Sequence, residues 1–217
     1  MIVDLNIQNK TAIVIGGGNE AEKRINSLLK QNCEILVISD SVNTEIKKLV
    51  KTKKIKLKTQ KIQNTKFISE IKPNIIITTT NDKKLNQKII NSAKRKKIIV
   101  YSSDNPDDSD FSNPAIIDFE GIIQIAIFTG GQSPAMSRKI KVKAEGIFKK
   151  IISHEDISHI KIQKMARKLA KETIDTQSQR KEYLHNVMTD NTIDQLIKDG
   201  QIKKAENRAA ILLRNWK

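Results

Sequence analysis

The chain has 217 residues, enough for one large core or for a main domain with a smaller appendage. Its single cysteine excludes an internal disulfide, which predicts a reducing, cytoplasmic location. No apolar run reaches the roughly 20 residues that span a bilayer, and the start has no signal-type pattern, so we expect no membrane association.

The net charge of +16 comes from 40 basic and 24 acidic side chains. We rank a general lysine-rich composition first as its cause, attraction of a small polyanionic substrate second, and nucleic-acid binding third. Aromatic residues make up only 4% of the chain and arginines are few. Base stacking and bidentate base readout depend on those residue types, so no nucleic-acid partner is predicted.

The first half of the chain alternates short apolar runs with amphipathic segments. Continuous apolar runs are typical of strands buried on both faces, and their alternation with helices predicts a Rossmann-type, doubly wound parallel sheet in an α/β fold. Strands are predicted at 11–15, 35–38, 54–58, 74–78 and 98–101, and helices at 20–31, 44–50 and 82–96.

The pattern changes after residue 101. A polar loop is predicted at 102–113, then a hairpin of strands 115–118 and 122–128 around Glu120-Gly121, then helices with breaks near 153–154, 175–178 and Gly200. A lone hairpin is marginal in water, so we expect two hairpins to pair across a homodimer. The predicted parts are an NAD-binding domain (1–112), a small β-containing dimerisation region (113–145) and a helical C-terminal domain (146–217).

A glycine-rich turn lies between the first predicted strand and helix. It fits the G-x-G-x-x-A pattern, in which Gly16 permits the tight turn, Gly18 lets the backbone approach a pyrophosphate, and Ala21 lets the helix pack closely. The pyrophosphate would bind at the helix N-terminus. The alternative is a structural turn without a ligand. The predicted cofactor-binding residues here are Gly16, Gly17, Gly18, Asn19, Glu20 and Ala21.

Three more residues complete the predicted cofactor site at the carboxyl edge of the sheet. Asp40 ends the second strand, 24 residues after Gly16, where a carboxylate binds the ribose hydroxyls and favours NAD over NADP. An aspartate that only starts a turn is the alternative for Asp40. Thr79 and Thr80 follow the fourth strand at the same edge, and the nearby Asp82 is also suited to cap the next helix.

Asp104 follows the fifth strand at this edge. A carboxylate there is suited to accept a proton or orient a substrate, but these residues alone favour a solvated loop aspartate. The three histidines and Cys33 lack ligand-like spacing, so no metal site is predicted, and a structural thiol is favoured over a nucleophile.

Taken together, these residues resemble the siroheme synthase N-terminal module family, which comprises precorrin-2 dehydrogenases and sirohydrochlorin ferrochelatases. The resemblance covers roughly residues 3–145, and its most specific part is the run Thr129-Gly-Gly-Gln-Ser-Pro134. Many members have valine in place of Glu20 and proline in place of Asp40, which leaves the ribose role of Asp40 open. The other matching residues are Gly16, Gly18, Ala21, Lys23, Arg24, Thr80, Asp82, Asn86, Asp104, Phe111, Pro114, Ala115, Gly121 and Arg138.

The resemblance implies an NAD-dependent oxidation of precorrin-2, a polycarboxylate tetrapyrrole, to sirohydrochlorin by a homodimer. It also implies that Asp104 is catalytic, whereas the residues alone favour a solvated loop aspartate. Some members also insert iron. The alternative from another class is an NAD(H)-sensing regulatory module without catalysis, which leaves residues 129–134 unexplained. The implied substrate-binding residues are Asn113, Pro114, Thr129, Gly130, Gly131, Ser133 and Arg138.

Overall fold

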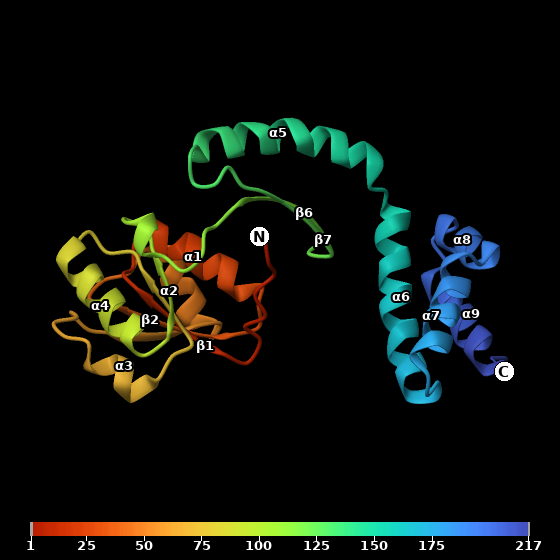
Figure 1. Ribbon diagram of the computed structural model, residues 1–217, viewed down its shortest axis with the longest axis horizontal. Coiled ribbons are helices and arrows are strands. Elements are labelled where there is room, and N and C mark those ends of the chain that lie inside the picture. Colours follow the sequence, from red (N-terminus) through yellow and green to blue (C-terminus); the bar gives the residue numbers. More distant parts are fainter. Residues whose placement is uncertain (1, 217) are drawn as a thin grey trace. The chain divides into compact units, whose positions relative to one another are not determined.

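The computed structural model describes residues 2–216 and divides the chain into two compact units, one ending at Asn113 and the other beginning at Pro114. Each unit is described by itself. The first contains β1 (Thr11–Ile15), α1 (Asn19–Leu29), β2 (Glu34–Ser39), α2 (Thr44–Lys51), β3 (Lys56–Thr59), α3 (Lys66–Ile71), β4 (Ile75–Thr78), α4 (Lys83–Arg95), β5 (Ile99–Ser102) and a short 3₁₀ turn, Pro106–Asp108 (Figure 1).

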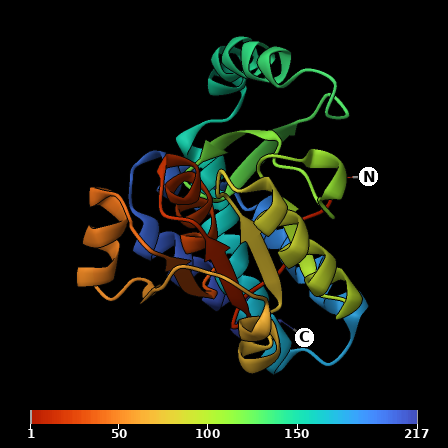
Figure 2. The same ribbon diagram turned by 90° about the vertical axis from the view of Figure 1, so that its left-hand side faces the viewer.

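The five strands form one parallel sheet in the order β3-β2-β1-β4-β5. Successive residues of β1 alternate between two cores: Val14 packs toward α1 and α2, and Ile13 packs toward α3 and α4. Figure 2, which looks onto this unit, shows the helices on both sides of the sheet. The predicted Rossmann-type fold is confirmed. Helix α3 was not predicted, because its six residues are too few for a periodic pattern.

The strand order places a topological switch point at the carboxyl ends of β1 and β4. Strand β2 lies on one side of β1 and strand β4 lies on the other. Ligands of such folds bind at this switch point. The backbone N–H of Gly16 donates to the carbonyl of Ile38 over 3.0 Å, and that of Thr79 donates to Ile15 over 2.9 Å. The turns that follow β1 and β4 are therefore tied to the sheet itself.

The second unit begins with the predicted hairpin. Its turn has φ of 54° at Glu120 and 68° at Gly121, as a type I′ turn requires, and Ile122 N–H donates to the Phe119 carbonyl over 2.9 Å. The unit comprises β6 (Ala115–Phe119), β7 (Ile123–Ile127), α5 (Pro134–Ile151), α6 (His154–Thr173), α7 (Gln177–Met188), α8 (Asn191–Lys198) and α9 (Ile202–Arg214).

Helices α6 to α9 share one apolar core, which contains the fully buried ring of Tyr183. The Tyr183 hydroxyl donates to the carbonyl of Ala209 over 2.9 Å. The helix breaks predicted near 153, 175–178 and 200 are found, but the break before α8 was missed. Asp190 makes that break by capping α8, since its Oδ1 accepts from the N–H of Ile193 over 2.9 Å. Within residues 2–216, no helix combines the length and apolarity needed to cross a bilayer.

Asp190 also gives a first testable prediction. Arg208 donates to its Oδ2 over 2.8 Å. Burial raises the pKa of Asp190, but the Arg208 guanidinium and the Ile193 N–H outweigh burial and hold that pKa below its ordinary 3.8. We expect Asp190→Ala to lower the free energy of unfolding of the α6–α9 bundle by about 1–3 kcal/mol at neutral pH. Because a depressed pKa stabilises the folded state above the unfolded pKa, this difference shrinks as the pH falls below about 4.

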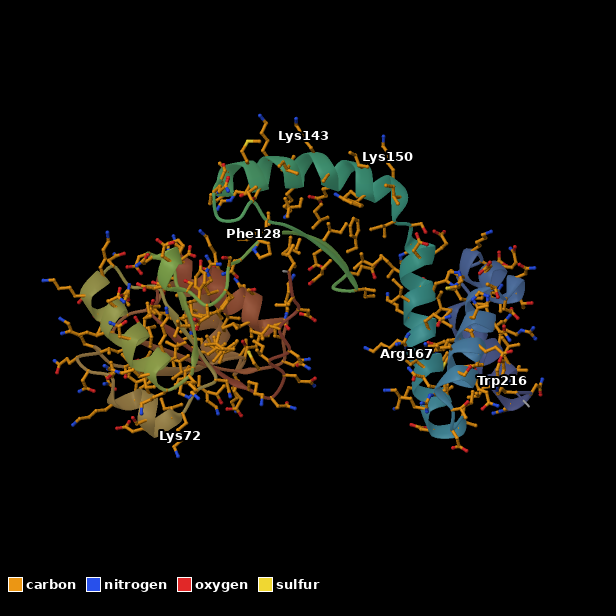
Figure 3. The ribbon with its side chains drawn as sticks, in the orientation of Figure 1. Lys72, Phe128, Lys143, Lys150, Arg167 and Trp216 are labelled. Carbon is orange, nitrogen blue, oxygen red and sulfur yellow. The ribbon has the colours of Figure 1, made fainter. Side chains whose placement is uncertain are left out.

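Urea unfolding followed by tryptophan fluorescence measures this difference. Trp216 is the single tryptophan of the chain and lies edge-on to the ring of Tyr183, with centroids 5.7 Å apart, so its emission reports on the bundle (Figure 3). An equal loss at neutral pH and at about pH 3 would show that the Asp190 carboxylate is not the stabilising group.

Candidate functional site

The three glycines of the turn after β1 have different surroundings. Gly16 has φ of +113°, and a Cβ there would lie 2.5 Å from Thr79 Oγ1. A Cβ on Gly17 would lie 2.0 Å from the carbonyl oxygen of Ser41. At Gly18 a Cβ would meet no atom within 4 Å. The fold itself therefore needs Gly16 and Gly17, whereas the absence of a side chain at Gly18 leaves space next to the backbone.

The N-terminus of α1 opens into that space. Gly18 is the N-cap residue, and no side-chain cap accepts a hydrogen bond from the first turn of the helix in the part of the chain that the structure describes. Unpaired N–H groups and the helix dipole favour an anion at this position. Ala21 is fully buried, so the helix packs closely on the sheet as predicted. The residues present fit the pyrophosphate of a dinucleotide.

Glu20 stands in the first turn of α1 and is paired within its own helix. It forms ion pairs with Arg24 and, over 3.3 Å, with Lys23. Burial raises the pKa of Glu20, but the two cations together lower it below its usual 4.5. Arg24 in turn lies 4.6 Å above the ring centroid of Tyr101. The charge of Glu20 is thus compensated next to the position where a phosphate would bind.

The loop after β2 lies against the glycine turn. Asn43 N–H donates to the carbonyl of Gly17 over 2.9 Å, and the Asn43 side chain caps α2 and donates to Glu22 over 2.6 Å. Asp40 is exposed, and its only hydrogen bond within residues 2–216 comes from the Ser41 hydroxyl over 3.4 Å. Asn43, not Asp40, caps the helix, so the Asp40 carboxylate is available for a ribose.

The threonines after β4 have their hydroxyl groups engaged within the fold. Thr79 Oγ1 donates to the carbonyl of Ile15 over 2.7 Å, which ties the end of β4 to the end of β1. Thr80 Oγ1 donates to Asn86 Oδ1 over 2.6 Å. Asp82 caps α4 by accepting from the N–H of Leu85 over 2.9 Å, so the capping interpretation is right. The two hydroxyls therefore hold the end of β4 to β1 and to α4.

Asp104 lies just beyond β5 and is held by two hydrogen bonds to one oxygen. Its Oδ1 accepts from Asn86 Nδ2 over 2.9 Å and from Ser102 Oγ over 2.8 Å. Both donors are 1% exposed, whereas Asp104 itself is exposed. Asp104 is thus an exposed loop aspartate, as the residues alone favour, but its carboxylate is also held by β5 and by α4.

Sequence reasoning gave no role to Asn86 or Ser102. Two signals were present for Asn86: it is one of the residues that match the family, and it occupies the buried face of α4, at helical spacing from Ile89 and Ile90. A polar side chain at such a position needs a buried partner. One partner, Thr80, is only six residues away, but the other, Asp104, lies in the loop after β5, and this contact was not visible in the sequence.

The predicted substrate-binding residues beyond Asn113 belong to the second unit. Gly130 and Gly131 have φ of 63° and 78° and form a tight loop before α5. Ser133 caps α5 by accepting from the N–H of Met136 over 3.2 Å, and Thr129 Oγ1 lies 3.1 Å from Ser137 Oγ. The loop is thus rigidly braced. Asn113 and Arg138 are exposed, and Pro114 is half-buried.

Three further observations concern metal ligands, the cysteine and cavities. No group of three or more histidine, cysteine, aspartate or glutamate side chains in residues 2–216 is arranged to hold a metal ion. Burial raises the pKa of the Cys33 thiol, which fits a structural thiol better than a nucleophile. A cavity of about 760 Å³ lies at the opposite, amino edge of the sheet, and none of the predicted site residues lines it.

Comparison with known proteins decides the family. Residues 3–115 match the model of a family described as putative NAD(P)-binding. The chain belongs to this family. The matched segment contains the glycine turn, Asp40, Thr79, Thr80 and Asp104. The predicted nicotinamide dinucleotide cofactor is thereby confirmed as the ligand class of this NAD(P)-binding domain.

Curated proteins similar to this chain include siroheme synthases. That of Actinobacillus pleuropneumoniae serotype 7 (strain AP76) is 25% identical over 202 residues, which are 93% of this chain and 40% of that protein. That of Vesicomyosocius okutanii is 33% identical over 141 residues, 65% of this chain and 29% of that protein. The predicted resemblance is confirmed, and the chain spans about two fifths or less of the length of these relatives.

A solved structure shares the fold over nearly the whole chain. The match is to "SirC, precorrin-2 dehydrogenase", with a TM-score of 0.69 and 21% identity, and it covers 96% of this chain and 99% of that one. The arrangement of a Rossmann-type sheet, a two-stranded hairpin and a helical C-terminal part is therefore shared by the two proteins. The three-part domain division and the roles of individual residues stay predictions.

Proposed function

We propose that the chain is an NAD-dependent precorrin-2 dehydrogenase. The observation that carries the proposal is the carboxylate of Asp104, fixed by two buried donors at the carboxyl edge of a dinucleotide-binding sheet. The siroheme synthase relatives and the run Thr129–Pro134 support the substrate class. In the reaction, precorrin-2 loses a hydride and a proton to give sirohydrochlorin, and NAD⁺ is reduced to NADH.

In this proposal each part of the site has a distinct task. The N-terminus of α1 and the open side of Gly18 hold the pyrophosphate, and Asp40 accepts hydrogen bonds from the ribose, which disfavours a 2′-phosphate. NAD, when bound, supplies the hydride acceptor. Asp104 takes the proton or orients the macrocycle.

The composition supports the proposed substrate and location. A net charge of +16 attracts a polycarboxylate tetrapyrrole through the field of the whole protein. The single cysteine supports a reducing compartment, the cytoplasm.

Anaerobic incubation of the full chain with precorrin-2 and NAD tests this proposal. We expect the absorbance of sirohydrochlorin and of NADH to rise together. Binding of NAD without turnover would contradict the dehydrogenase and favour a nucleotide-sensing module. Ferrous iron added after the first step would reveal a second, iron-inserting activity through a further change in the absorbance of the macrocycle.

We also propose that the second unit forms the interface of a homodimer. Four large apolar side chains of α5 are spaced four, seven and four residues apart and form one stripe on the helix. Their exposed fractions range from 40% to 64%. The stripe borders the face toward β6 and β7, from which the labelled Lys143 and Lys150 point away (Figure 3). The stripe comprises Met136, Ile140, Ile147 and Ile151.

A charge in this stripe should break the dimer. We expect Ile147→Glu to shift the chain from dimer to monomer in sedimentation experiments, because an unpaired buried carboxylate costs several kcal/mol. The matched control is Val142→Glu. Val142 is 72% exposed and lies on the other side of α5, so this change should leave the oligomeric state unaltered. A dimer that survives Ile147→Glu would place the interface elsewhere.

A further inference from the structure

Asn86 has every polar group of its side chain engaged. Its Oδ1 accepts from Thr80 Oγ1 over 2.6 Å, and its Nδ2 donates to the Thr80 carbonyl and to Asp104 Oδ1, each over 2.9 Å. The carbonyl and the carboxylate can only accept, so the amide nitrogen has to face both of them. A flipped amide would set its oxygen against two acceptors, and this fixes the orientation of Asn86.

Ser102 holds the same carboxylate from the other side. It is the last residue of β5, pairs in register with Thr78 of β4, and donates to Asp104 Oδ1 over 2.8 Å. Its backbone N–H is bonded to Ser109 Oγ over 2.9 Å, which holds β5 and the following loop together. Two donors on separate elements, α4 and β5, therefore converge on one oxygen of Asp104.

We propose that Asn86 and Ser102 are positioning residues that fix Oδ1 of Asp104 and so turn Oδ2 toward the substrate. This inference rests on the proposed function. No side chain among residues 2–216 donates to Oδ2, and Asp104 is exposed, so this second oxygen is the one left for the reaction. Buried donors determine the rotation of the carboxylate without contacting the substrate. Displacements of about 1 Å at a reacting group lower rates by about 100-fold.

Two variants remove one donor each. Asn86→Leu keeps most of the volume, and Ser102→Ala removes only the hydroxyl. We expect each to lower kcat by about 10- to 100-fold, with the affinity for NAD and the KM for precorrin-2 within about twofold of wild type. Asn91→Leu is the matched control on α4, because Asn91 is exposed and its side chain makes a single hydrogen bond among residues 2–216, which it accepts from Gln87. If Asn86→Leu fails to fold, Ser102→Ala still tests the proposal.

The conservative variant Ser102→Thr separates positioning from packing. It restores the hydroxyl, so it should recover most of the kcat that Ser102→Ala loses. A loss of kcat that runs in parallel with lost NAD affinity or a lower unfolding temperature would assign both residues a structural role and overturn the proposal. Unchanged kcat in both donor variants would overturn it as well.

Crystal structures of the wild type and of Ser102→Ala give a readout that does not depend on activity. We expect a single Asp104 rotamer in the wild type, with Oδ1 on both donors, and more than one rotamer in the variant. A single, unchanged rotamer in the variant would contradict positioning. An inactive wild type with an ordered Asp104 would contradict the proposed dehydrogenase instead, so the two failures can be told apart.

Discussion

Replacing Asp104 by asparagine should abolish the NAD-dependent oxidation of precorrin-2 while leaving NAD affinity nearly unchanged. Asparagine has the same shape, and its Oδ1 still accepts from Asn86 and Ser102 in the arrangement seen here. Its NH₂ group then occupies the position of Oδ2, where it donates and cannot take a proton. Loss of a general base lowers rates by about 10²- to 10⁴-fold. Steady-state kinetics together with NAD titration measure both quantities.

Asp107→Asn is the control for the Asp104 variant. Asp107 is exposed and lies in the short 3₁₀ turn of the same loop, so its substitution removes the same charge without touching the sheet edge. We expect its rate to stay close to that of the wild type. If Asp104→Asn keeps the full rate, Asp104 is neither the base nor the group that orients the substrate.

Replacing Gly18 by alanine should weaken NAD binding about tenfold or more without destabilising the protein. The backbone there has φ of −87° and ψ of −168°, which alanine adopts readily, and the added methyl group meets no protein atom within 4 Å. Only a bound pyrophosphate would approach that methyl group. A tenfold loss corresponds to about 1.4 kcal/mol of binding free energy. Calorimetric titration with NAD and thermal unfolding give the two measurements.

The neighbouring glycine provides the contrast. In Gly17→Ala the methyl group would lie 2.0 Å from the Ser41 carbonyl oxygen, so the fold itself should be destabilised. Gly146→Ala in α5 has open space and no role in the site, and it should leave NAD binding unchanged. Wild-type NAD affinity in Gly18→Ala would show that the cofactor does not bind against this turn.

Much of the fold could be predicted because the buried strands and the amphipathic helices each leave a simple pattern in the sequence. The strands of the parallel sheet are buried on both faces, so they appear as continuous apolar runs such as Ala12–Ile15. Helix α3 was missed because it has only six residues and lies between polar loops. The break before α8 was missed because Asp190 is a single capping residue in an otherwise helical pattern.

The site was less predictable, because its main contacts join residues far apart in the sequence. Asn86 and Asp104 are 18 residues apart in the sequence. They meet because α4 is followed directly by β5, which returns the chain to the carboxyl edge of the sheet. Local sequence around Asp104 contains other aspartates and gives no sign of the two donors. The pairing of Glu20 with Arg24 is local, four residues apart, but the approach of Arg24 to the Tyr101 ring joins residues far apart in the sequence.

The central claim is that a hydride passes from precorrin-2 to NAD on this chain. The most direct measurement is the amount of NADH formed for each sirohydrochlorin in a sealed, anaerobic reaction with the full chain. The proposed hydride transfer yields one NADH for each sirohydrochlorin, at a rate proportional to protein concentration. Sirohydrochlorin that forms without NADH, or no reaction while NAD binds normally, would contradict it.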